Sequence, residues 1–127
     1  MGDIEWNQEA PYNNACPVID GVHCPTGCVA TAFAQVMKYY NYPSATIKRI
    51  PAYRSSSGFV AQYEKGTPIN WQDIRDFYSP NGNNYTSKEA DAVAQLCAMV
   101  GAACEMNYNI EGSSSTNEVA MKSAIKY

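Results

Sequence analysis

The sequence has few charged residues, a single histidine and no long apolar run, and each shortage excludes a class of protein. Charged residues make up 17% of the chain, below the roughly 25% typical of globular domains. The net charge is −3, from nine basic and twelve acidic residues, and no basic stripe is present that would bind nucleic acid. No apolar stretch approaches the length of a membrane span. We therefore expect neither nucleic acid nor a membrane as a partner.

The shortage of histidine bears on metals. His23 is the only histidine, and the five cysteines contain no Cys-x-x-Cys pair. Structural zinc sites take four cysteine or histidine ligands, so we expect no metal site and no cofactor. The start of the chain, Met1-Gly2-Asp3, also lacks the charged and apolar regions of a secretory signal peptide.

The 127 residues, 46% of which are hydrophobic, allow one domain with a core, and the most informative stretch covers residues 28–41. It predicts a helix that begins with Cys28 and ends at Asn41, because the Tyr42-Pro43 pair disfavours helical backbone. Thr26 is placed to cap the free amides of the first turn. Apolar residues recur at i, i+4, i+7 and i+11 and predict one buried stripe: Val29, Phe33, Val36 and Tyr40.

The cysteine at the start of this helix is a candidate nucleophile. Cys28 stands where exposed N–H groups and the positive end of the helix dipole favour an anion. Such a position lowers the pKa of a thiol, and the thiolate is the reactive form. Gly27 precedes it and leaves the sulfur uncrowded from that side. The alternative is a small buried residue that happens to begin a helix.

The other four cysteines allow two interpretations. An odd total leaves at least one cysteine outside any disulfide, and Cys28 is the natural candidate. Cys16 and Cys24 flank a short turn-rich loop and could bridge. Cys97 and Cys104 would lie about 10 Å apart if both were helical, too far for a disulfide. If the helix ends at Gly101, that objection lapses. The favoured alternative is that all four are buried, reduced thiols.

The rest of the chain predicts short elements joined by turns. Residues 1–26 are irregular because turn residues oppose long elements, and Trp6 is expected to pack as an anchor. Further elements expected along the chain are these: a loose extended connection with a short strand or two over 44–68, a short helix over 71–78 capped by Asn70, a turn-rich loop over 79–85, a short strand over 102–109, and a helix that opens with the capping box at Ser115 and runs to Tyr127.

A longer helix is expected from Ser87, its cap, to about Val100, with Gly101 as the stop. Its apolar residues recur at helical spacing: Ala90, Val93, Ala94, Cys97 and Val100.

Several of these stretches resemble the streptopain family, bacterial secreted cysteine peptidases of papain-like fold. Two motifs are the most specific. Gly27-Cys28-Val29-Ala30-Thr31, with Gln35-Val36-Met37-Lys38-Tyr39 after it, resembles the nucleophile segment. Trp6-Asn7-Gln8 with Pro11-Tyr12-Asn13 resembles the start of the mature enzyme. Further stretches match in order: Ile69-Asn70-Trp71, Ala94-Gln95-Leu96, Val100-Gly101 and Met106-Asn107-Tyr108.

The resemblance implies an α+β, papain-like peptidase fold, of which residues 1–127 are the mainly helical, nucleophile-bearing N-terminal half with few short strands. Cys28 would be the nucleophile. Gln8 would donate its side-chain amide to the oxyanion hole beside the Cys28 N–H, as a neutral donor that does not titrate. A serine-bearing turn, Ser113-Ser114-Ser115, would line the substrate groove; alternatively it is a turn in which Ser115 caps a helix.

The family's catalytic histidine lies well downstream, so a missing segment or a second chain would supply it. His23 is expected to pack or hydrogen-bond locally instead. The leading hypothesis is therefore part of a secreted, extracellular cysteine endopeptidase acting on proteins or peptides, and inactive as this chain alone. One alternative is a non-catalytic helical module for binding or assembly. A weaker one is a relative of transglutaminases or bacteriocin-processing peptidases, which the Gln8 segment fits less well.

Overall fold

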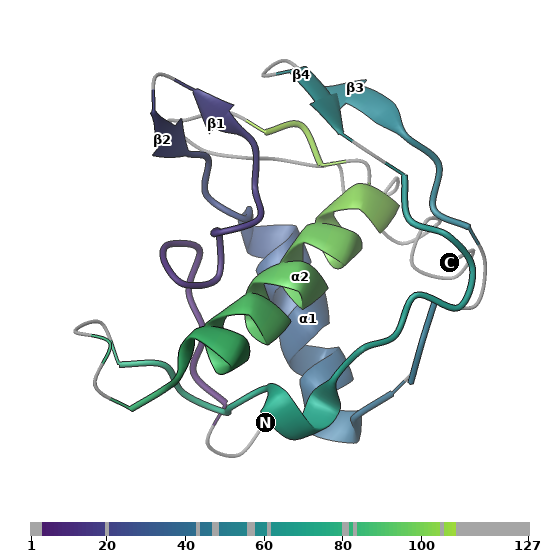
Figure 1. Cartoon of the computed structure of the whole chain (residues 1–127). Helices are drawn as coiled ribbons and strands as arrows, with labels where there is room; N and C mark the ends of the chain where they lie inside the picture. Colours follow the sequence, from purple (N-terminus) through teal and green to yellow (C-terminus); the bar gives the residue numbers. More distant parts are fainter. Residues whose placement is uncertain are drawn as a thin grey trace.

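The structure, a computed structural model, describes residues 4–19, 21–42, 44–46, 49–55, 58–60, 62–79, 82, 84–104 and 106–108. Within these ranges two α-helices pack against each other, and two short antiparallel hairpins lie toward the upper end of the helix pair in Figure 1. The elements are, in chain order, β1 (Val18–Ile19), β2 (Val22–His23), α1 (Cys28–Tyr40), β3 (Tyr53–Ser55), β4 (Gly58–Val60), the 3₁₀-helix η1 (Trp71–Asp73) and α2 (Ser87–Ala103). None of the described helices is long and apolar enough to span a membrane.

The first predicted helix is confirmed as α1, and its end follows the sequence signals. Asn41 adopts left-handed backbone angles, φ 50° and ψ 45°, and its N–H donates to the Lys38 carbonyl at 3.2 Å. Asparagine tolerates this conformation and closes many helices in this way. The predicted cap is wrong, because the N-cap is Gly27 at φ 90°. The Thr26 hydroxyl instead lies 2.6 Å from the Thr31 hydroxyl.

The predicted apolar stripe of α1 is only partly correct. Val29 and Phe33 are half-buried against the core, but Val36 is 44% exposed and Tyr40 70% exposed. The fully buried positions are the small residues Ala30 and Ala34. Small side chains let two helices approach closely, so the buried face is rotated from the bulky stripe toward the alanines.

Helix α2 is confirmed with the predicted apolar face entirely buried. Its cap is Thr86, one residue before the predicted Ser87. The Glu89 N–H donates to the Thr86 hydroxyl at 3.2 Å, and the Thr86 N–H donates to the Glu89 carboxylate at 2.9 Å. The hydrogen bond from the Thr86 backbone, with Arg75 nearby, lowers the pKa of Glu89. This reciprocal pair is a capping box, which satisfies two free amides at once.

Gly101 does not stop α2 as predicted, because the helix continues to Ala103. The chain then turns back, and the Met106 N–H donates to the Gly101 carbonyl at 2.9 Å. The predicted strand over 102–109 is therefore replaced by the end of the helix, a turn and a bridge at Asn107. The Tyr108 ring lies directly over Gly101, where a Cβ atom would overlap the phenol oxygen. The glycine permits this close packing.

The remaining elements follow the predictions unevenly. The extended connection over 44–68 contains the β3–β4 hairpin, as expected, and the irregular first 26 residues contain the small β1–β2 ribbon. The predicted helix over 71–78 is wrong beyond η1, and the Asn70 side chain does not cap it. Ile74 is extended, and Phe77 bridges to Glu5 in parallel, so pairing with the N-terminal segment replaces the helix. The predicted helix from Ser115 lies outside the described residues.

The favoured interpretation of the cysteines is confirmed. Cys16, Cys24, Cys97 and Cys104 are buried thiols, and the alternative bridge between Cys16 and Cys24 is not formed.

We predict that Gly101→Ala destabilises the fold, although alanine normally favours a helix interior over glycine by roughly 1 kcal/mol. Overpacking against Tyr108 should instead lower the free energy of unfolding by about 1–3 kcal/mol, measured by urea unfolding. Adding Tyr108→Phe removes the overlapping oxygen and should recover part of the loss. A more stable Gly101→Ala variant would contradict this packing.

Candidate active site

Two buried aromatic residues fix the segment that carries Gln8. Trp6 is buried, and its indole N–H donates to the Arg75 carbonyl at 3.0 Å. Tyr12 is also buried, with its ring edge-on to Tyr78 at a centroid distance of 5.5 Å. Burial of such rings stabilises a fold by several kcal/mol each. Trp6 thus packs as the predicted anchor, and Gln8 lies between two anchored positions.

Hydrogen bonds tie the same segment to α1. The Trp6 N–H donates to the Gln35 side-chain oxygen at 3.4 Å, and the Gln35 amide donates to the Thr31 carbonyl at 3.4 Å. The Thr26 N–H donates to the Gln8 carbonyl at 3.1 Å. The backbone of Gln8 is therefore held against the residue two before Cys28, and its side chain is half-buried.

The first turn of α1 is suited to hold an anion. Gly27 has φ 90° and ψ 139°, a conformation that favours glycine, and the Thr31 N–H donates to its carbonyl at 3.0 Å. No acidic residue occupies this turn, so its free N–H groups face no competing carboxylate from the helix. The structure thus brings together the backbone start at Cys28 and the Gln8 segment. The Cys28 thiol and Ser113, Ser114 and Ser115 lie outside what the structure describes.

The single histidine is engaged locally, as predicted. His23 Nδ1 lies 2.9 Å from the Cys16 carbonyl. A carbonyl only accepts, so Nδ1 is the donor and carries its proton toward Cys16. The His23 carbonyl in turn lies 3.5 Å from the Asn13 side-chain amide. These contacts hold His23 within the β1–β2 ribbon.

Burial makes three of the described thiols poor nucleophiles. Loss of solvation raises the pKa of Cys16 to about 12, although a hydrogen bond with Tyr108 opposes this effect. Burial also raises the pKa of Cys104 to about 11, and it raises the pKa of fully buried Cys97. Since the thiolate is the reactive form, these side chains remain protonated and unreactive near neutral pH.

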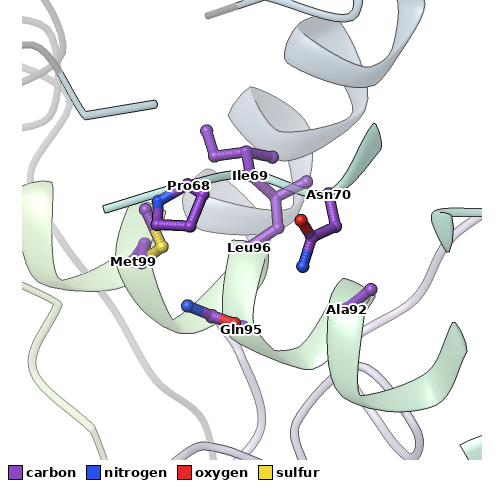
Figure 2. A pocket seen from close by; sticks show the side chains of 7 residues that line it. All are labelled: Pro68, Ile69, Asn70, Ala92, Gln95, Leu96 and Met99. Atoms are coloured by element: carbon purple, nitrogen blue, oxygen red, sulfur yellow. The ribbon is translucent and has the colours of Figure 1, made fainter. Parts of the chain in front are cut away.

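A small pocket lies elsewhere, between α2 and the segment before η1 (Figure 2). It has about 10 Å³ of room for the centre of a water molecule, enough for about one water. Its described lining does not include Gln8 and consists of Pro68, Ile69, Asn70, Ala92, Gln95, Leu96 and Met99. Among the described residues, no cluster of three or more potential ligands could hold a metal ion.

Sequence reasoning missed the supports of this site. It assigned Thr26 to a cap and gave Thr31 and Gln35 no structural role. The one available signal was spacing, because Thr31 and Gln35 are four residues apart and share a face of α1. Their partners in the N-terminal segment follow only from the fold.

Comparison with known proteins gives matches over nearly the whole chain. The model of the peptidase C10 family matches residues 6–127. Streptopain of Streptococcus pyogenes is 34% identical over 134 aligned residues, which cover 91% of this chain and 33% of streptopain. The thiol protease/hemagglutinin PrtT of Porphyromonas gingivalis is 34% identical over 74 residues, which cover 56% of this chain and 8% of PrtT.

Solved structures of interpain A from Prevotella intermedia have the same fold. The active wild-type cysteine protease superposes with a TM-score of 0.80 at 36% identity, over 94% of this chain and 50% of that one. A fragment of a prointerpain A mutant gives 0.81 at 35% identity, over 95% of this chain and 40% of that one. The predicted α+β, papain-like fold is confirmed, and so is the resemblance to streptopain. The chain spans about a third of streptopain and half of interpain A.

We predict that iodoacetamide at mildly acidic pH labels Cys28 faster than Cys97, by about 10-fold or more, when a segment that carries the expected catalytic histidine is added. Burial keeps the Cys97 thiol protonated, whereas the start of α1 favours a thiolate. Peptide mass spectrometry would follow both residues. Cys28→Ser should remove the fast label, and denaturant should equalise the remaining thiols. Equal labelling of Cys28 and Cys97 in the folded protein would contradict an activated thiol.

Proposed function

The chain belongs to the peptidase C10 family, and from this we propose that it is the nucleophile-bearing part of a secreted cysteine endopeptidase. Cys28 is the proposed nucleophile, and Gln8 is the proposed side-chain donor of the oxyanion hole. The hydrogen bond from the Thr26 N–H to the Gln8 carbonyl, 3.1 Å long, carries the proposal. It brings the Gln8 segment, which lies twenty residues before Cys28 in sequence, to the start of α1.

The proposed reaction is acyl transfer through a thioester. The Cys28 thiolate adds to the peptide carbonyl carbon, and the carbonyl electron pair moves to oxygen. That oxyanion accepts hydrogen bonds from the Gln8 amide and the Cys28 N–H. Collapse expels the amine, which takes a proton from an imidazolium, and leaves an acyl-enzyme. Water, deprotonated by the imidazole, then cleaves the thioester and restores the thiol.

The proposed base is a histidine from a further segment or a second chain. His23 is not the proposed base, because the resemblance to the family implies a catalytic histidine well downstream of Cys28. The His23 ring is engaged within the β1–β2 ribbon, where Nδ1 lies 2.9 Å from the Cys16 carbonyl. Protein or peptide substrates are proposed from the family. Ser113, Ser114 and Ser115 remain proposed groove residues, whose hydroxyls could pair with a peptide backbone.

A non-catalytic assembly module is the second candidate, and one observation favours it. At the end of α1, Val36, Tyr39 and Tyr40 are exposed, with the two tyrosine rings edge-on at 5.0 Å. Exposed apolar side chains gathered in one place favour association. Light scattering separates the candidates, because this module would self-associate whether or not Cys28 is intact.

We predict that Gln8→Ala lowers kcat about 10²–10³-fold in the peptidase that combines this chain with its histidine-bearing segment. KM should change little, because the donor acts mainly on the developing oxyanion. The matched control is Glu9→Ala, an exposed neighbour in the same segment, which should keep full kcat. Full activity of Gln8→Ala would exclude Gln8 from the oxyanion hole.

We also predict that this chain by itself does not cleave casein, because the proposed base is not His23. The assay compares the chain with its Cys28→Ala and His23→Ala variants, using release of fluorescent peptides. Cleavage that disappears in both variants would show that His23 is the base and that the assignment of a separate histidine is wrong.

A further inference from the structure

Thr26 and Thr31 form a buried hydroxyl pair that the proposed chemistry does not use. Their Oγ1 atoms lie 2.6 Å apart, and the residues are 0% and 5% exposed. A buried hydroxyl without a partner costs stability, and here one hydroxyl donates a hydrogen bond to the other. The pair spans the Gly27–Cys28 peptide, with Thr26 before it and Thr31 one helical turn after it.

Each threonine also makes a backbone hydrogen bond toward one of the two proposed oxyanion donors. The Thr26 N–H donates to the Gln8 carbonyl at 3.1 Å, which holds the Gln8 segment. The Thr31 N–H donates to the Gly27 carbonyl at 3.0 Å. The Gly27 carbonyl and the Cys28 N–H belong to one planar trans peptide and point in opposite directions. Thr31 therefore directs the Cys28 N–H out of the helix start.

We propose that Thr26 and Thr31 are positioning residues that set the separation of the Gln8 side chain and the Cys28 N–H. This inference rests on the proposed function of those two groups. The hydroxyl pair links two hydrogen bonds. One, from the Thr26 N–H, locates Gln8, and the other, from the Thr31 N–H, orients the Cys28 N–H. Without the pair, two links remain between these hydrogen bonds. One is the backbone at Gly27, whose φ of 90° lies in a region where glycine is conformationally free. The other is the longer path from Thr31 through Gln35 to Trp6, made of two hydrogen bonds of 3.4 Å.

We expect loss of the hydroxyl pair to weaken stabilisation of the transition state and not substrate binding. An oxyanion hole acts only if its donors lie at hydrogen-bond distance from the developing charge, and a displacement of about 1 Å can cost 10²-fold in rate. The thiol itself depends on the helix start, which the hydroxyl pair does not supply. Loss of the pair should therefore lower kcat and leave alkylation of Cys28 unchanged.

The test uses Thr26→Val and Thr31→Val in the complete peptidase, because valine keeps the shape and removes the hydroxyl. Each should lower kcat about 10-fold or more, with KM and the rate of Cys28 alkylation within about twofold. The affinity for a peptide aldehyde should fall by a factor similar to kcat, because the thiol adds to the aldehyde carbon and creates the same oxyanion. Thr26→Ser, which keeps the hydroxyl, should restore both quantities.

Thr46→Val is the matched control for loss of a buried threonine. Thr46 is 8% exposed, and its hydroxyl donates to the Glu64 carbonyl at 2.8 Å, in a loop that contributes no proposed catalytic group. It should lower the melting temperature without lowering kcat. Assays are run well below the melting temperature of each variant. If Thr26→Val does not fold, Thr31→Val gives the same comparison, with Thr31→Ser as the variant that keeps the hydroxyl.

The outcomes separate the two proposals. If the unaltered peptidase shows no Cys28-dependent cleavage, the proposed function fails and the positioning role fails with it. If the unaltered enzyme is active and the valine variants keep its kcat and aldehyde affinity, only the positioning role is overturned. An equal loss of kcat in Thr46→Val, or in Thr26→Ser, would also overturn it, since a general loss of stability would then explain the effect.

Discussion

The close packing of α1 on α2 is the constraint on which the rest of the structure depends. On α1 the buried apolar positions are Ala30 and Ala34, and α2 contributes Val93, Leu96 and Cys97 to the same core. Small residues on one helix allow larger ones on the other to fill the space between them. This choice turns the bulky side of α1 away from α2, which is why Val36 and Tyr40 remain exposed. It also fixes the axis along which the first turn of α1 presents its N–H groups.

The N-terminal segment is laid over this helix pair by apolar anchors and a few polar bonds. Trp6 and Tyr12 stabilise the segment by being buried. The hydrogen bonds with Gln35 and Thr26 fix its orientation, because a hydrogen bond requires both distance and angle. Burial alone would hold the segment without setting its register. The polar bonds alone would contribute only about 1 kcal/mol each. Burial and hydrogen bonds together fix the position of this segment, although it forms no regular helix or strand.

The sequence predicted the existence and type of the long elements better than their contacts. Both α-helices follow from apolar periodicity and terminal signals, and Asn41 ends α1 where expected. The orientation of α1 did not follow, because periodicity identifies the bulky face and not the face that a neighbour will select. Gly101 shows the same limit: a glycine near the end of a helix pattern fits a stop as well as a close contact. Only the position of Tyr108, which depends on the whole fold, decides between them.

The candidate site likewise has residues that the sequence predicts and supporting contacts that it does not. A cysteine at a helix start and a glutamine twenty residues earlier can be read from the sequence and its family resemblance. Their supports cannot, because the partner of Thr26 is a hydroxyl rather than the free amides that its position suggested. An interaction between side chains five residues apart across a helix start has no periodic signature. Only the structure shows that Thr26 contacts two residues at once, the Gln8 carbonyl through its N–H and the Thr31 hydroxyl through its own.

The contrast among the cysteines gives the last step of this argument. The proposed function requires one reactive thiol among the five of this chain, and any other exposed thiolate could be alkylated or oxidised. The fold addresses this by burial: desolvation raises the pKa of Cys16, Cys97 and Cys104, so they hold their protons. A helix start acts in the opposite direction, because its free N–H groups favour the anion. Selectivity for one sulfur therefore does not need a unique cysteine. It needs the core that excludes water from the others and the helix that this same core holds in place.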